Sequence, residues 1–269
     1  MNTLYSLDLL PIISSFKRKL LFGLILTFSL IFISLVISKS VFGQTPTTKI
    51  SLLDQRVPTQ TNIVGIVGGE TIPVQVSMSN LTDPNRLAAF TFKIIYKPSL
   101  SSLADTNGDG IAETGTVTSG SFLGSSGKQV SCSSPYIDPV KNNTSKKQLS
   151  FSCVTLGNTP AAPTGSGTLA LVNFKTGNTL GSSILTLNST ELADDTENAN
   201  LIPHTAVSIP IQIAKCADFD GDRKVRGSDI LYVVNKYYTN DTLADLDGNG
   251  SVRGVDILLA VSEYYRTCP

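Results

Sequence analysis

The C-terminal part of the chain contains one sequence unit in two copies. Residues 217–238 align with residues 244–265 without a gap, and 13 of the 22 aligned positions are identical. Each copy opens with an aspartate-rich loop and continues into a segment whose apolar residues recur at helical spacing. In the first copy these apolar positions are Ile230, Leu231, Val234, Tyr237 and Tyr238. The repeat predicts two loop–helix units whose helices pack on one another, because neither could bury its apolar stripe alone.

Both loops have the residue types and the spacing of a calcium site. Calcium takes about six to eight oxygen ligands, which a loop of about twelve residues supplies from positions 1, 3, 5, 7, 9 and 12. Position 7 contributes its backbone carbonyl, and the arginine at position 9 leaves its place to water because arginine has no acceptor. We expect one calcium ion in each loop, with ion-free acidic turns as the alternative. The expected ligands are Asp218, Asp220, Asp222, Lys224 and Asp229 in the first loop, and Asp245, Asp247, Asn249, Ser251 and Asp256 in the second.

The two loops differ at position 6, where a calcium loop needs a sharp turn. Gly250 meets this need in the second loop, whereas the first loop has Arg223. A non-glycine residue in left-handed geometry costs about 1–2 kcal/mol. Against this cost, the first loop offers four carboxylates and the second only three, so the sequence does not rank the two affinities.

A third acidic stretch, DTNGDGIAE at residues 105–113, has a similar spelling in a different context. Five of its residues fit the first five ligand positions: Asp105, Asn107, Asp109, Ile111 by its carbonyl, and Glu113. Gly110 provides the turn, but position 12 is Thr116 and no amphipathic helix follows. A third calcium ion and an unliganded Asn-Gly/Asp-Gly turn are therefore both open interpretations.

Between residues 62 and 213 apolar side chains alternate with polar ones, and Gly, Pro, Asn and Ser clusters separate the alternating runs. This period of two indicates half-buried antiparallel strands, and about eight or nine such segments predict a two-sheet β-sandwich or jelly roll. The inward faces are expected to hold Phe90, Phe92, Ile94 and Tyr96, then Leu149, Phe151 and Cys153, then Ala170, Val172 and Phe174, and finally Val207, Ile209, Ile211 and Ile213. The chain is therefore expected to be mainly β, with a small α-helical module at its end.

The N-terminal segment has the pattern of a targeting sequence. Basic residues 17–19 precede an apolar run at residues 20–37, and residues 41–43 resemble a cleavage site. A cleaved signal peptide and a retained membrane anchor are both open, since the run is nearly as long as a membrane-spanning helix. The expected organisation is residues 1–43 as signal or anchor, 44–61 as linker, 62–213 as sandwich and 214–269 as the repeat module.

If the chain is exported, its four cysteines are expected to form two disulfides, because disulfides form in oxidising compartments. Three pairings are possible, and local pairing of Cys132 with Cys153 and of Cys216 with Cys268 is the most economical. The first bridge would join neighbouring strands at the edge of the core, and the second would close the repeat module. Four buried free thiols are the alternative.

The repeated DxDGDxxVxxxDI and DxDGNGxVxxxDI segments, each ending in Tyr-Tyr, resemble a type I dockerin module over residues 217–265. The resemblance implies a module that folds on binding two calcium ions and docks into cohesin modules of extracellular scaffolds. It also implies partner contacts at loop positions 10 and 11 and on the helices behind them. In this sequence those positions are Gly227, Ser228, Gly254, Val255, Asn235, Lys236, Ser262 and Glu263.

The strand pattern of residues 62–213 is similar to that of cohesin domains, in the order GGETIPVQVSMSN, LAAFTFKIIYKPSL, GSGTLALVNFKTGN and AVSIPIQI. Related sandwiches bind carbohydrate, generally through exposed aromatic faces. The absence of tryptophan favours a cohesin-like protein-binding sandwich over a polysaccharide binder.

Composition argues against several other functions. The formal net charge is zero and there is no long Lys/Arg run, so nucleic acid is not an expected partner. The single histidine, His204, has no nucleophile motif to serve, and no enzymatic activity is expected. We expect a secreted or cell-surface assembly protein whose partners carry cohesin or dockerin modules, copies of this chain included. A cell-surface polysaccharide binder is the alternative, and a membrane contact is expected only through an uncleaved N-terminal segment.

Overall fold

The structure is a computed structural model that describes residues 47–268, so the expected signal or anchor segment at residues 1–43 lies outside it. Within the described part, no helix combines the length and the apolar character needed to cross a bilayer. The elements are β1 (Lys49–Asp54), β2 (Ile63–Ile66), β3 (Thr71–Leu81), β4 (Leu87–Tyr96), β5 (Ser101–Ser102), β6 (Val117–Ser119), β7 (Gln129–Cys132), β8 (Tyr136–Val140), β9 (Asn143–Leu156), β10 (Gly165–Thr176), β11 (Gly181–Asp194), β12 (Thr205–Val207), β13 (Ile209–Ala214), α2 (Gly227–Asn235) and α3 (Gly254–Ser262).

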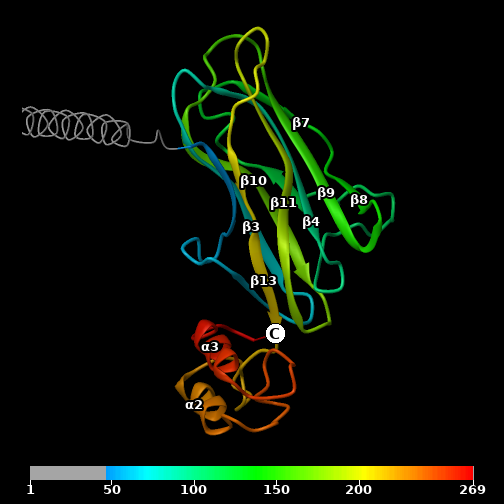
Figure 1. Ribbon diagram of the computed structural model, residues 1–269, viewed down its shortest axis with the longest axis vertical. Helices are drawn as coiled ribbons and strands as arrows, with labels where there is room; N and C mark the ends of the chain where they lie inside the picture. Colours follow the sequence, from blue (N-terminus) through cyan, green and yellow to red (C-terminus); the bar gives the residue numbers. More distant parts are fainter. Residues whose placement is uncertain (1–46, 269) are drawn as a thin grey trace, which may run out of the picture. The chain divides into compact units, whose positions relative to one another are not determined.

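The strands form two sheets, and their long members run alongside one another in Figure 1. One sheet has the order β12-β1-β3-β10-β5, with β6 also paired to β10. The other has the order β2-β13-β11-β4-β9-β7, with β8 also paired to β9. Neighbouring strands are antiparallel except for β1 with β12 and β2 with β13, which are parallel. Because one buried apolar cluster draws side chains from both sheets, the two sheets make the predicted sandwich.

The alternating sequence pattern explains which side chains fill the core. Phe92 of β4 and Phe151 of β9 lie in one sheet with ring centroids 5.9 Å apart. Tyr96 of β4 meets Phe174 of β10 edge-on at 5.4 Å, which joins the two sheets. The predicted inward residues are buried with one exception, Val207, which is 40% exposed because it lies in the short edge strand β12.

The sandwich begins earlier than predicted. Residues 49–54, which were expected to be linker, form β1 and pair with β3 along its length. Ile50 and Leu52 of this strand are buried in the core, because KISLLD has the same alternation as the later strands. The linker prediction for residues 44–61 is therefore wrong where it includes β1.

Both predicted disulfides are present, and none of the cysteines in residues 47–268 is free. Cys132 of β7 stands directly opposite Cys153 of β9, so this bridge ties the edge strand to its neighbour. Cys216 and Cys268 bracket the C-terminal repeat, 52 residues apart in sequence. Closing so long a loop restricts the unfolded chain, which stabilises the folded module by roughly 4 kcal/mol in the chain-entropy account.

The C-terminal repeat forms the two expected helices, α2 and α3, which pack against each other. The residues they bury differ from the prediction. Val233 is buried in α2, whereas Leu231 and Tyr238 are 61% and 71% exposed. The reason is the shortness of each nine-residue helix, whose inner side is already covered by the acidic loops and by the other helix. The apolar stripe predicted to be the packing face is mostly a surface face.

Candidate metal centre and interaction surface

The second acidic loop gathers three carboxylates. Oxygens of Asp245, Asp247 and Asp256 lie within 4.8 Å of one another, and Asp256 is fully buried. Asp256 is fixed by the backbone, since Oδ1 accepts from Leu246 N at 2.8 Å and Oδ2 from Arg253 N at 2.7 Å. Burial raises the pKa of Asp247, and the neighbouring charge of Asp256 raises it further. A bound cation would relieve this repulsion.

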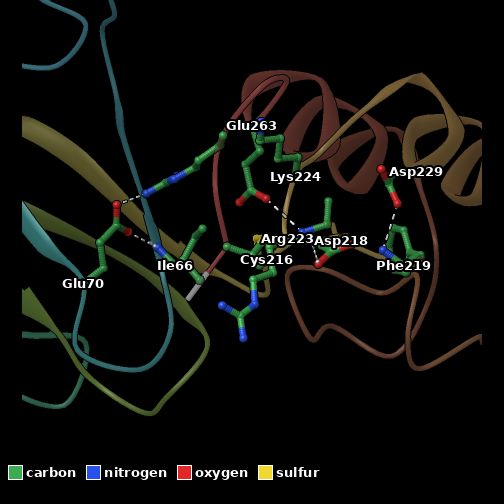
Figure 2. The surroundings of a disulfide bond; sticks show 12 residues. Ile66, Glu70, Cys216, Asp218, Phe219, Arg223, Lys224, Asp229 and Glu263 are labelled. Carbon is green, nitrogen blue, oxygen red and sulfur yellow. Dashed lines mark hydrogen bonds and ion pairs between the residues drawn. A yellow bond between two sulfur atoms is a disulfide. The ribbon is translucent and has the colours of Figure 1, made fainter. Parts of the chain in front are cut away.

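The first loop gathers Asp218, Asp220 and Asp222 within the same 4.8 Å limit. Its fourth predicted carboxylate, Asp229, is buried and faces the backbone. Its Oδ1 accepts from Phe219 N at 2.8 Å (Figure 2), and its Oδ2 accepts from the N–H of Arg226 at 2.8 Å. The structure therefore brings three of the four carboxylates together, and Asp229 organises the turn that leads into α2.

The donor chemistry of both loops fits a hard divalent cation. The gathered side-chain donors are all carboxylate oxygens, with neither histidine nor thiol among them, which is the set that calcium or magnesium prefers. Lys224 and Ser251 would add backbone carbonyls at position 7, and Asn249 an amide oxygen. Calcium held there would neutralise the carboxylates and tie each loop to the first turn of its helix.

Both loops make the same left-handed turn at position 6. Gly250 has φ 92°, and Arg223 has φ 65° in the first loop (Arg223 is labelled in Figure 2). Each donates its N–H to the first aspartate of its loop, Arg223 to Asp218 and Gly250 to Asp245, at 2.9 Å in both cases. The turn therefore imposes on Arg223 the strained conformation that the sequence predicts.

The two repeats exchange backbone hydrogen bonds at position 8 of each loop. Val225 receives the N–H of Tyr265 at 2.8 Å and donates its own to the carbonyl of Arg266 at 3.0 Å. Val252 does the same with Tyr238, at 3.0 Å, and Thr239, at 2.8 Å. Each loop is therefore hydrogen-bonded to the segment that follows the other repeat's helix. Tyr238 and Tyr265, three residues after α2 and α3 end, take left-handed φ values of 64° and 65°.

Glu263 was predicted to contact a partner, but it is fully buried and the prediction is wrong. Its Oε2 accepts from Ala217 N at 2.9 Å (Figure 2), and its Oε1 has no hydrogen-bond partner among the described residues. Burial raises the pKa of Glu263 to about 7. Its counterpart in the first repeat, Lys236, is instead partly exposed and pairs with Asp241 at 3.1 Å.

The remaining predicted partner positions reach the surface. The exposed ones are Gly227, Ser228, Asn235, Gly254, Val255 and Ser262. Between them lie Leu231 and Leu258, which are 61% and 68% exposed and occupy equivalent places in the two repeats. Leu231 was expected to lie in a buried stripe, so this surface was not predicted from the sequence. Helical spacing places residues 228, 231 and 235 on one face, but it does not say whether another element covers that face.

The third acidic stretch is held by its own hydrogen bonds. Asp105 Oδ1 accepts from Gly108 N at 2.9 Å, and Asp109 Oδ1 accepts from Ile111 N at 2.8 Å. Glu113 turns back to Thr106, whose hydrogen bonds lower the pKa of this carboxyl. These carboxylates are not among the described groups that converge within 4.8 Å. Asn107 Nδ2 donates to Asp109 Oδ2 within the same turn, at 3.0 Å. A calcium ion at residues 105–113 stays a prediction.

His204 has both ring nitrogens engaged. Its Nε2 lies 2.7 Å from the hydroxyl oxygen of Thr190, and its Nδ1 lies 2.8 Å from the carbonyl oxygen of Ile202. The bond with Thr190 joins the bulged strand β11 to the segment before β12, in which both His204 and Ile202 lie. A structural role accounts for this histidine.

Comparison with known proteins gives cohesin domains among the solved structures. A non-cellulosomal cohesin from Archaeoglobus fulgidus is 17% identical, with 62% of this chain and 91% of that chain covered and a TM-score of 0.39. A type II cohesin domain from the cellulosome of Acetivibrio cellulolyticus is 21% identical, with 62% and 95% covered and a TM-score of 0.45. The seventh ScaB type I cohesin from Pseudobacteroides cellulosolvens is 13% identical, with 64% and 96% covered and a TM-score of 0.43.

All three TM-scores lie below 0.5. No protein-family profile matches the sequence, and no curated protein matches it.

Replacing Arg223 with glycine should tighten calcium binding in the first loop. Glycine adopts φ 65° freely, and the relief of strain is partly offset by the greater freedom of glycine in the unfolded chain. We expect the calcium affinity of this loop to rise about two- to fivefold, measured by calorimetric titration of the full chain. The matched control is Lys224→Gly, where φ is not left-handed, and it should bring no gain. Equal or weaker binding by the Arg223 variant would contradict the assignment of this turn.

Replacing Glu263 with glutamine should remove a pH dependence of the module. The folded pKa of about 7 lies above the ordinary value of 4.5, so the stability that protonated Glu263 contributes is lost as pH rises between these values. From pH 4.5 to pH 8, the unfolding free energy of the Gln variant should therefore rise by about 3 kcal/mol relative to that of wild type. Urea unfolding at constant calcium measures this difference. The same substitution at exposed Glu197 is the control, and parallel pH profiles for the Glu263 variant and wild type would exclude the effect.

Proposed function

We propose that this chain is an exported, non-catalytic assembly protein. Its C-terminal module binds two calcium ions and docks onto a cohesin-type β-sandwich of a partner protein. The observation that carries the proposal is the pair of equivalent exposed faces, centred on Leu231 and Leu258, on a module whose acidic loops gather carboxylates. Exposed apolar side chains on an ordered helix commonly mark protein-binding surfaces.

The composition of these faces supports a protein partner. Each leucine is flanked by small or uncharged side chains, Ser228 and Asn235 beside Leu231, and Val255 and Ser262 beside Leu258. A surface with an apolar centre and a polar rim is typical of a protein–protein interface. The Gly at loop position 10 of each repeat leaves the start of the helix accessible to another backbone.

Calcium would fix the positions of the two exposed helix faces, because the loops determine where the helices begin. Asp229 and Asp256 each cap the first turn of a helix while standing at position 12 of a loop. Loading of the loops would therefore order α2 and α3, and their outer faces with them. The two disulfides are compatible with a secreted or cell-surface location.

The sandwich is less well suited to polysaccharide, the alternative function. Among residues 47–213, Tyr136 is the only Phe or Tyr side chain that is not buried, and it is 48% exposed. One tyrosine on the edge strand β8 does not form the aromatic platform against which sugar rings stack. A cohesin-like role for the sandwich would allow chains to join head to tail, the module of one copy binding the sandwich of the next.

Charged substitutions at the two leucines should abolish binding to a cohesin partner. We propose to immobilise the full chain and to measure binding of purified type I and type II cohesin domains, and of the full chain itself, by surface plasmon resonance. The variant Leu231→Asp with Leu258→Asp should weaken any binding at least about a hundredfold, since buried unpaired charge is costly at an interface. Removing calcium with EGTA should have the same effect.

The control for this experiment is Leu201→Asp, which changes an equally exposed leucine of the sandwich and should leave binding unchanged. Binding that survives both EGTA and the double substitution would contradict the proposal. If the chain stays monomeric in calcium at all concentrations in sedimentation, the head-to-tail arrangement is excluded while docking onto another protein is not.

A further inference from the structure

The C-terminal module shares a buried surface with its own sandwich. Val64 of β2 is 7% exposed, and the apolar cluster to which it belongs is that of the module, with Ala217, Leu246 and Cys268. Val64 alternates with Ile63, which is buried in the sandwich core. A single strand of the sandwich thus supplies one side chain to each of the two cores. Burial of a valine in this way stabilises the contact independently of charge.

A partly buried ion pair lies at the edge of this surface. Arg266, four residues after α3, pairs with Glu70, the residue before β3, and their side chains are only 21% and 22% exposed. Arg56 of the sandwich pairs with the same Glu70 oxygen at 2.6 Å. The other Glu70 oxygen accepts from Ile66 N at 2.5 Å, as Figure 2 shows. Glu70 is therefore fixed by its own sandwich before Arg266 reaches it, so the pair loses less conformational freedom than a surface pair.

The second acidic loop also contacts the sandwich. Lys215, which follows β13, donates its backbone N–H to the Leu246 carbonyl at 3.0 Å. Its ammonium group donates to the Asp245 carbonyl at 2.9 Å. Gly248 lies so close to Leu180, beside β11, that a Cβ there would come within 2.9 Å of the leucine side chain. Three residues of the expected calcium loop are thus in contact with the sandwich or its connection: Asp245 and Leu246 with Lys215, and Gly248 with Leu180.

We propose that these contacts form a calcium-dependent latch. When the second loop is ordered by its ion, the module is held in one orientation on its sandwich by Val64, Glu70 and Lys215, and when the ion leaves, the module is released as a tethered segment. This inference rests on the calcium binding in the proposed function but concerns the chain's own architecture. Two residues, Lys215 and Cys216, separate β13 from the repeat. With the latch closed in calcium, the module keeps a fixed position relative to the sandwich.

Hydrogen exchange of the full chain tests the latch. Deuterium uptake is followed by mass spectrometry at residues 63–70, at the Lys215 amide and in α2 and α3, first in saturating CaCl2 and then after EGTA. We expect EGTA to raise the exchange rate at residues 63–70 and at Lys215 at least about fivefold, together with exchange in the helices. In calcium, Arg266→Gln should raise exchange at residues 63–70 by itself while the helices stay protected.

Two further variants make the result specific. Glu70→Gln changes the sandwich side, keeps an acceptor for Ile66 N, and should reproduce the effect of Arg266→Gln even if the latter disturbs the module. Asp83→Asn removes a comparable pair with Arg86, 3.1 Å long and exposed on the sandwich, and should change nothing. If EGTA releases the helices but exchange at residues 63–70 and Lys215 is unaltered, the latch is overturned and the calcium module stands. If EGTA leaves the helices unchanged as well, the calcium assignment and the latch both fall.

Discussion

The exchange of backbone hydrogen bonds between the two repeats is the constraint on which the C-terminal module depends. Val225 and Val252 each bind the chain just past the other repeat's helix. A loop cannot change its path without moving the end of the partner helix, so the two loops and two helices form one cooperative unit. The Cys216–Cys268 bridge closes this unit at its ends. Ordering of either acidic loop is therefore expected to order the whole module.

The aspartate at position 12 connects this unit to its chemistry. Asp229 and Asp256 accept backbone N–H groups from the residue before their helix, which is the geometry of a helix N-terminus. In the calcium loops that we propose, the same side chain stands at position 12 and would be the last oxygen donor. Burial of a carboxylate is costly, and these backbone hydrogen bonds and a bound cation would both offset the cost. One residue would therefore link the proposed ion, the start of the helix and the exposed leucine two residues further on.

The sequence was sufficient for the sandwich and for the repeat, because both rest on periodic patterns. Phe92 and Phe151 are buried as the period of two requires. The burial of Glu263 could not be predicted, since an exposed glutamate at the end of a helix looks the same in sequence. It follows from Ala217 N, a long-range partner that only the folded module supplies. The exposure of Leu231 was missed for a related reason, because helical spacing identifies an apolar face but does not say whether another element covers it.

Calorimetric titration of the metal-stripped full chain with CaCl2 tests the central claim most directly. The account predicts binding by the C-terminal loops, and a stoichiometry that falls by two ions per chain in the variant Asp218→Asn with Asp245→Asn. Each substitution removes a charge from one of the two gathered sets of carboxylates. Absence of binding by the wild-type chain, or a stoichiometry that the double substitution leaves unchanged, would contradict the account.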